Sequence, residues 1–194
     1  RSFSVYTNVV EDKSENKEGK SVLLYFVDNT AYKNLKDKYT SQYPIIAKIE
    51  VDNFSEAISS APSEIRPLLI AEIDSTISQY FEEYHALVRK MDEDLYLVVM
   101  TYKSLTILKD KRFDILDDLR DLNKGNSIPI TLSIGVSSFG LNFKDAYLEA
   151  DSSLDLALGR GGDQAVVKVD DNYAFFGGKL SLIHISEPTR RYAI

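Results

Sequence analysis

The sequence has 194 residues, enough for one full domain and part of another. It carries 23 Lys and Arg against 30 Asp and Glu, a formal net charge of −7, which argues against nucleic acid or an anionic membrane surface as the main partner. There is no cysteine, so disulfides, thiolate zinc sites and cysteine nucleophiles are excluded. No apolar run approaches the roughly 20 residues of a membrane-spanning helix, so we expect an acidic cytoplasmic portion without a transmembrane segment.

Both ends of the chain read as cut rather than natural. The first residue is Arg1, and the strand-like pattern begins at once. At the other end, Leu180 to Arg190 read LSLIHISEPTR, the translation of a transposon adapter used in sequencing libraries. We therefore interpret residues 180–194 as a sequencing-adapter scar and exclude His184 as a ligand. A natural apolar strand with a basic tail is the alternative.

The first 43 residues predict a hairpin and a helix. Residues 1–11 and 21–27 are rich in β-formers and flank the polar stretch DKSENKEGK, and a charged helix is expected before Pro44. Two closing strands followed by a charged helix resemble the end of a PAS domain and its signalling linker. On that resemblance, residues 1–28 are the C-terminal part of a PAS domain and residues 29–43 are a linker helix.

From Ile45 onward the elements alternate regularly. The order β-α-ββ-α-β-α-β, with split βαβ units, predicts an α+β sheet with helices packed on one side. The expected elements are a strand IIAKIEVD, a helix over about 63–84, a hairpin of ALVRK and LYLVVM, a helix over about 105–122, a strand ITLSIGVSS, a helix from the cap Asn142 to about Leu158, and a last strand AVVKV.

Three motifs in this order resemble GGDEF domains, the fold of bacterial diguanylate cyclases. IEVDNFSEAI is similar to DxDxFKxIND, ITLSIGVSSFG to VTxSIGVA, and LEADSSLDLALGRGG to LLxxADxALYxAKxxGRN. The continuation GRGGDQAVVK, with YAFFGGK after it, resembles the GdpP type of cyclic-di-AMP phosphodiesterase, in which this run leads into a DHH phosphoesterase domain. The resemblance implies a degenerate GGDEF domain over residues 44–169 and the start of a connection to an absent DHH domain over 170–179.

The positions that serve GTP chemistry in this family are mostly altered. Active members need a divalent cation held by carboxylates, basic groups on the triphosphate, and glycines where the backbone passes against the nucleotide. The resemblance therefore implies that this chain is not an active diguanylate cyclase. The altered positions are Met91 and Asp92 for the two glycines of the turn, Ile58 and Ser59 for the guanine-reading pair, and Leu158 and Gly162 for the phosphate-holding Lys and Arg.

Carboxylates survive where the family binds Mg²⁺. Glu50 matches the first Asp of the DxD motif, and Glu93 matches the third letter of GGDEF. The resemblance implies a metal site at Glu50 and Glu93 for Mg or Mn, with Asp52, Asp94 and Arg160 as weak nucleotide contacts. The alternative is that all five are ordinary surface residues. His85 is expected to pack at a helix end, and no catalytic residue is assigned.

The resemblance implies a regulatory, signal-transmitting part of a membrane-anchored protein. The intact protein would hold heme in its PAS domain and hydrolyse cyclic-di-AMP to a linear dinucleotide in the DHH domain that this chain lacks. The expected partners are a second copy of the chain and weakly bound ATP, with cyclic-di-AMP in the absent domain and no nucleic acid. Two alternatives remain open: a weak Mg-dependent ATPase or nucleotide-binding module, and a ligand-free dimerisation scaffold.

Overall fold

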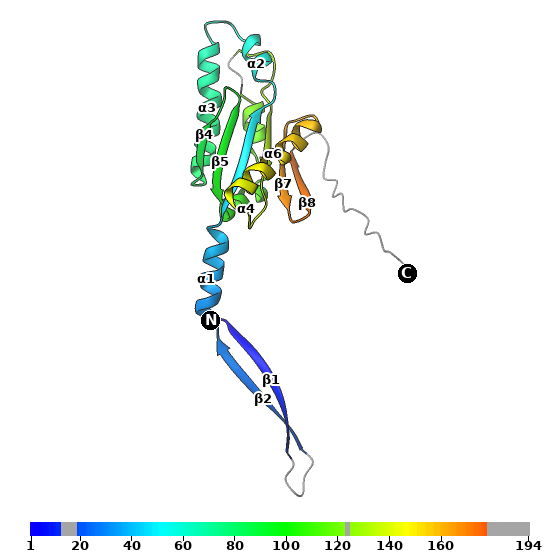
Figure 1. The fold of residues 1–194 in the computed structure, drawn as a ribbon. Helices are drawn as coiled ribbons and strands as arrows, with labels where there is room; N and C mark the ends of the chain where they lie inside the picture. Colours follow the sequence, from blue (N-terminus) through cyan, green and yellow to red (C-terminus); the bar gives the residue numbers. More distant parts are fainter. Residues whose placement is uncertain (13–18, 123–124, 178–194) are drawn as a thin grey trace, which may run out of the picture. The chain divides into compact units, whose positions relative to one another are not determined.

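The computed structural model describes residues 1–12, 19–122 and 125–177. The chain divides into two compact units, Arg1–Gln42 and Tyr43–Ile194 (Figure 1). The predicted adapter scar, residues 180–194, lies outside the described residues. Within the described parts, no helix is long and apolar enough to cross a membrane.

The first unit contains the predicted hairpin and helix. Strands β1 (Phe3–Asp12) and β2 (Gly19–Asp28) pair antiparallel, and α1 (Thr30–Ser41) follows. The Thr30 amide donates to the Asp28 carboxylate at 2.9 Å, which helps the chain to turn from β2 into the helix. Both elements are confirmed, whereas their assignment to a PAS domain and linker stays a prediction.

The second unit is built on one six-stranded sheet in the order β4-β5-β3-β6-β7-β8 (Figure 1). Only β6 and β7 run parallel; the other neighbours are antiparallel. The elements are β3 (Pro44–Val51), α2 (Phe54–Ser60), α3 (Arg66–Glu83), β4 (Leu87–Lys90), β5 (Leu95–Thr101), α4 (Tyr102–Asp110), α5 (Ile115–Arg120), β6 (Leu132–Val136), α6 (Phe143–Gly159), β7 (Gln164–Val169) and β8 (Asn172–Gly177).

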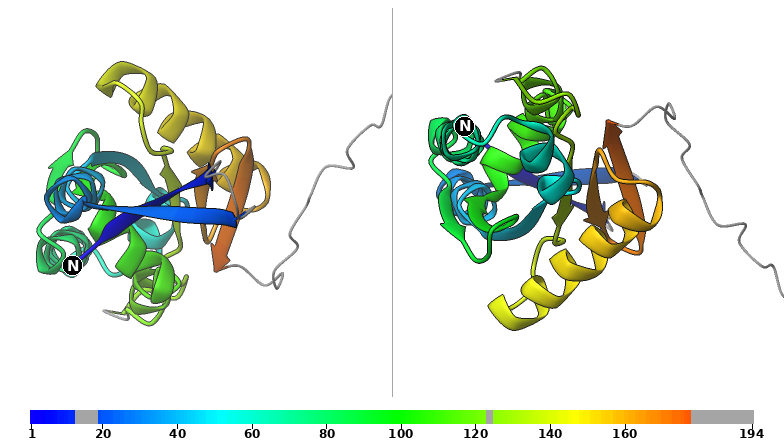
Figure 2. Two further views of the ribbon diagram at one scale, coloured as in Figure 1. Left: turned by 90° about the horizontal axis from the view of Figure 1, so that it is seen from below. Right: turned by 90° about the horizontal axis from the view of Figure 1, so that it is seen from above.

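Helices cover both faces of this sheet, so the prediction of helices on one side is wrong. Ile45, Ala47 and Ile49 of β3 enter the large core, which also contains buried residues of α2, α3, α4 and α5. The intervening Ile46 packs instead with Ala146 and Ala150 of α6. Successive side chains of a strand point to opposite faces, so the central strand is buried from both sides. Figure 2 shows α6 separate from the other helices.

The predicted helix over 105–122 is two helices in the structure. Arg112 and Phe113, between α4 and α5, have φ values of 59° and 54°, which no continuous helix accommodates. The Phe113 side chain is fully buried and lies 5.3 Å from the Phe176 ring, centroid to centroid. Burial of Phe113 against a strand distant in sequence therefore accounts for the break.

Two further elements complete the domain. The short helix α2 buries Phe54 and Ala57 directly after β3, where the resemblance of IEVDNFSEAI to a GGDEF strand and helix implied a helix. AVVKV is not the last strand, because β8 pairs antiparallel with β7 along its whole length. Phe176 of β8 packs against the large core, which gives this strand its place at the sheet edge.

The contact between α6 and β6 is unusually close. A Cβ atom on Gly135 would lie 2.2 Å from the Leu154 amide nitrogen and 2.3 Å from the Ala150 carbonyl oxygen. The Ser153 hydroxyl donates across the same contact to the Val136 carbonyl at 3.3 Å. Helix backbone therefore rests almost directly on strand backbone, and only glycine fits between them.

We predict that Gly135→Ala destabilises the second unit by about 3 kcal/mol, because the new methyl group must displace helix backbone rather than a flexible side chain. Urea unfolding followed by circular dichroism measures the change. Gly159→Ala is the matched control: a Cβ there meets nothing within 4 Å, and alanine favours the helix end. Equal midpoints for wild type and Gly135→Ala would contradict the close contact.

Candidate functional site

The candidate site lies at the end of β3, where hydrogen bonds fix the backbone. Glu50 is the penultimate residue of β3 and faces Leu95 of β5 in the pairing register. The Val51 amide donates to the Asp94 carbonyl at 2.9 Å, and the Asp52 amide donates to the Thr131 carbonyl at 3.0 Å. The sheet therefore holds Glu50 and Asp52 beside the turn that matches the GGDEF motif.

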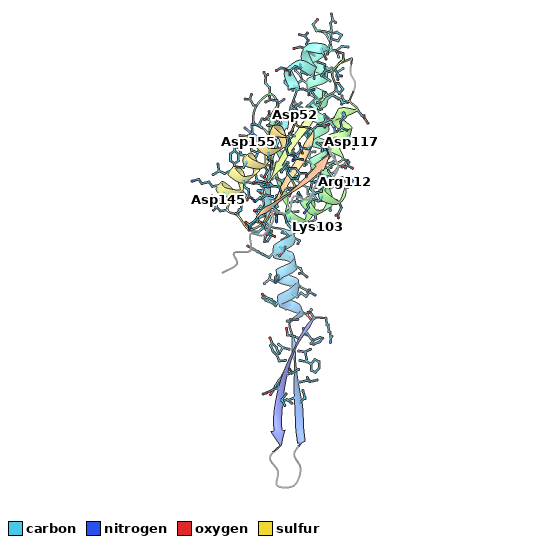
Figure 3. The ribbon with its side chains drawn as sticks, turned by 90° about the vertical axis from the view of Figure 1, so that its right-hand side faces the viewer. Asp52, Lys103, Arg112, Asp117, Asp145 and Asp155 are labelled. Carbon is cyan, nitrogen blue, oxygen red and sulfur yellow. The ribbon has the colours of Figure 1, made fainter. Side chains whose placement is uncertain are left out.

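Glu50 lies in an acidic environment. Burial is the main cause that raises its pKa above the usual value, followed by the negative charges of Asp94 and Asp52, with a smaller contribution from Asp155. The positive charge of Lys48 acts in the opposite direction. Figure 3 labels Asp52, which follows β3, and Asp155, which comes from α6. Carboxylates from three segments of the chain therefore surround Glu50.

Lys48 carries the balancing charge on this face. Its side chain is 9% exposed, forms an ion pair with Asp151 of α6, and lies 5.0 Å from the centroid of the Tyr147 ring. Burial alone lowers the pKa of Lys48, but the hydrogen bond and charge of Asp151 outweigh it, so the pKa is raised overall. Lys48 therefore stays charged and pairs with Asp151 of α6. Asp151 lies one helical turn before Asp155.

Asp52 is held by the loop that follows α6. Its Oδ2 atom accepts a hydrogen bond of 2.9 Å from the Asp163 amide, whereas Oδ1 is buried and has no hydrogen-bond partner among the described residues. A Cβ on Gly162 would lie 2.6 Å from Oδ2. The lack of a side chain at Gly162 therefore lets the loop close over the carboxylate.

The turn between β4 and β5 is a tight hairpin, as predicted. Met91 and Asp92 both donate their amides to the Leu95 carbonyl, at 2.8 and 3.2 Å, which closes a tight hairpin. Glu93 is exposed at this turn, and its amide donates to the Asp92 carboxylate at 2.8 Å. After burial, the negative charge of its neighbour Asp94 is the largest cause that raises the pKa of Glu50. The structure thus brings Asp94 to Glu50; the metal site at Glu50 and Glu93 stays a prediction.

Arg160, the remaining predicted nucleotide contact, is engaged by an aromatic ring. It caps the C-terminus of α6, and its guanidinium lies 4.3 Å from the centroid of the Phe175 ring of β8. This cation-π contact and the helix end both stabilise the charge where it is.

Sequence reasoning missed Asp155 and Asp163. Asp155 lies four residues after Asp151, so it follows on the same flank of α6, and this spacing was a signal that could have found it. Asp163 carried no such signal, because its role depends on the folded loop.

The residues fit a weakly held Mg²⁺ or Mn²⁺ better than a closed metal centre. Within the described ranges, no group of three or more His, Cys, Asp or Glu side chains could hold a metal ion. Carboxylate oxygens are nevertheless the ligands these cations prefer, and Mg²⁺ commonly binds one or two carboxylates while keeping several waters. The unpartnered Oδ1 of Asp52 supplies one such oxygen.

The fold and the position of these carboxylates define the class of protein: this is a GGDEF-type α+β domain. The structure is similar to the active GGEEF domain of a diguanylate cyclase from Vibrio cholerae, with a TM-score of 0.55 and 16% identity over 71% of this chain and 89% of that one. It is also similar to the FimX GGDEF domain from Pseudomonas aeruginosa, with a TM-score of 0.53 and 19% identity over 72% of this chain and 93% of that one. At these identities the likeness shows the fold alone.

Sequence comparison defines the family more narrowly. A family model described as "Cyclic-di-AMP phosphodiesterase GdpP-like, GGDEF domain" matches residues 49–175, and the chain belongs to this family. It is 31% identical over 158 residues to "Cyclic-di-AMP phosphodiesterase GdpP" of Bacillus subtilis, and 34% identical over 164 residues to "Cyclic-di-AMP phosphodiesterase PdeA" of Listeria monocytogenes. These matches cover 81% and 82% of this chain but only 24% of each relative, so the chain spans about a quarter of their length.

We predict that Glu50→Gln stabilises the domain at pH 7. Because the folded-state pKa of Glu50 lies above its usual value of 4.5, ionisation disfavours folding, and stability falls as pH rises through the folded-state pKa. Removing the charge should contribute roughly 0.5 kcal/mol at pH 7 and nothing at about pH 3.5, where wild type is already protonated in both states. Urea midpoints at the two pH values measure this.

Two variants test which neighbour matters to Glu50. Asp94→Asn should lower the pKa of Glu50 in a carboxyl NMR titration, whereas Glu93→Gln should leave it unchanged. A larger effect from Glu93→Gln would reverse the assignment of the neighbouring charge.

Proposed function

We propose that this chain is a regulatory, non-catalytic part of a cyclic-di-AMP phosphodiesterase. The match to the family over residues 49–175 supports the substrate class through the printed activity of the relatives. The hairpin turn supports the regulatory role and carries the proposal. Met91 and Asp92 stand where active cyclases have glycines, and both are exposed, so a side chain and a negative charge occupy the approach to a nucleotide.

The wider architecture is part of the same proposal. Because the chain spans about a quarter of its relatives, hydrolysis of cyclic-di-AMP to a linear dinucleotide would take place in a DHH domain elsewhere in the longer protein. Membrane anchoring, a cytoplasmic position for this domain, heme in a PAS domain and pairing of two copies belong to that proposal. The purified chain itself is expected to make no cyclic-di-GMP from GTP.

A graft into a relative tests the regulatory role. Residues 43–177 replace the matching segment of Bacillus subtilis GdpP, and cyclic-di-AMP hydrolysis is compared among wild type, the graft and a variant that lacks the segment. We expect deletion to change the rate and the graft to restore it, because a regulatory domain acts through its fold and contacts rather than through catalytic groups. A graft that hydrolyses cyclic-di-AMP at the same rate as the deletion would overturn the proposal.

A second candidate function, a weak Mg-dependent nucleotide-binding module, is favoured by one observation. Asp52 has a buried oxygen without a hydrogen-bond partner among the described residues, and burial together with the charges of Asp94 and Asp52 raises the pKa of Glu50. A divalent cation would relieve the repulsion among these groups. ATP binding would then depend on the metal and stay modest, because each absent phosphate contact forfeits roughly 1.5–3 kcal/mol.

We predict weak binding of Mn²⁺ by isothermal calorimetry, lost in the double variant Glu50→Gln, Glu93→Gln. The single variants Glu93→Gln and Asp94→Asn show which carboxylate of the turn takes part. Equal heats for wild type and the double variant would remove the metal site and leave a ligand-free dimerisation scaffold as the better interpretation of this domain.

A further inference from the structure

The loop Arg160–Asp163 is fastened on two sides by groups that belong to different elements. Arg120, the last residue of α5, places its Nη2 atom 2.8 Å from each carboxylate oxygen of Asp163. The Asp163 amide donates to Asp52. The side chain of Asp163 therefore contacts α5, and its backbone amide contacts Asp52 at the end of β3.

We propose that Arg120 and Asp163 form a latch that holds this loop closed over Asp52; its autoinhibitory effect on a bound cation rests on the second candidate function above. The contact places a peptide N–H of the same chain where an external ligand would bind.

The backbone of the loop shows why a fastening is needed. Gly161, Gly162 and Asp163 have φ values of 104°, 70° and 55°, so three consecutive residues lie in the left-handed region. Two of them are glycines, but Asp163 has a side chain, and this conformation costs a non-glycine residue roughly 1 kcal/mol. The closed loop therefore persists because contacts hold it, and the Arg120 ion pair is the strongest candidate among them.

The two ion pairs of Arg120 are not equivalent. The carboxylate of Asp163 is 20% exposed, whereas that of Asp117, which accepts from Nη1 at 2.6 Å, is 74% exposed. Charge-assisted hydrogen bonds are stronger where water is excluded. The hydrogen bond to Asp163 is also the main cause that raises the pKa of Arg120. Asp163 is thus the stronger ion-pair partner of Arg120, and substitution of Asp117 serves as a control.

Closure has a cost at Asp52 itself. One carboxylate oxygen accepts a single amide hydrogen bond, and the other is buried without a partner among the described residues. An ionised carboxylate prefers more hydrogen bonds or water, so opening would hydrate it. The closed loop therefore contains a residue with an unfavourable backbone conformation and a carboxylate with too few hydrogen bonds. Loss of the Arg120 ion pair should raise the population of the open loop.

Hydrogen exchange on the purified chain tests the latch. We expect Arg120→Gln to accelerate exchange of the Asp163 amide by roughly 10- to 100-fold, and the urea midpoint should fall as well, because the ion pair is also lost in the unfolded state. Asp163→Asn removes the same carboxylate and keeps both the amide and a residue that tolerates positive φ, so it should give the same acceleration. Asp117→Asn is the matched control and should leave exchange unchanged.

Paramagnetic broadening by Mn²⁺ alone is the second readout. In both latch variants the Asp52 amide should broaden at lower Mn²⁺ concentrations than in wild type. Unchanged Asp163 exchange in both variants would overturn the proposal, as would Asp163 exchange with the same urea dependence as the β3 amides, which indicates that the loop opens only when the domain unfolds. Mn²⁺ broadening of equal strength in wild type and both variants would show that the loop does not cover Asp52, and would also overturn it. Absence of broadening in every form would remove the metal site, and the exchange result alone would then decide whether the latch exists.

Discussion

The close packing of α6 on the central strands is the constraint on which the rest of the domain depends. Gly135 lets helix backbone lie against β6, and the ion pair between Lys48 and Asp151 ties the same helix to β3. The first contact sets how near the helix can come, and the second fixes its register along the strand. The Lys48 side chain is 9% exposed, whereas that of Asp151 is 45% exposed, so water screens the pair on the helix side and its contribution to stability is modest. The positions of Asp155 and of the loop that contacts Asp52 follow from this docking.

The electrostatics of the site are a consequence of the same register. With Asp151 paired to Lys48, the next turn of α6 carries Asp155 towards Glu50, where Asp52 and Asp94 already lie. One lysine therefore balances one carboxylate, and the others remain to repel each other. Repulsion from these carboxylates adds to the effect of burial and disfavours the ionised form of Glu50, whose pKa is raised.

Much of the fold could be predicted from local patterns, and the failures share one cause. The cap at Asn142 could be predicted from the sequence because it depends only on local residues. Its side chain accepts a hydrogen bond from the Asp145 amide, three residues away. The break at Phe113 was not, because it depends on packing against Phe176. Glu50 and Asp52 could be found from a motif, but Asp155 and Asp163 join them only through long-range packing. The segment IIAKIEVD also predicted a strand, but its pattern did not show that helices cover both faces of β3.

The presence or absence of glycine at two places determines which groups can approach the candidate site. In the turn, Met91 and Asp92 add side chains where a nucleotide would need bare backbone. At the exit of α6, Gly162 removes a side chain where a phosphate would need a cation, and the space is taken by the carboxylate of Asp52. Both changes act in the same direction, since one blocks the approach of a ligand and the other lets the chain satisfy its own carboxylate. The interactions at the centre of the site are therefore made within the domain: Asp52 accepts from the Asp163 amide in the loop after α6, and Asp163 pairs with Arg120 of α5.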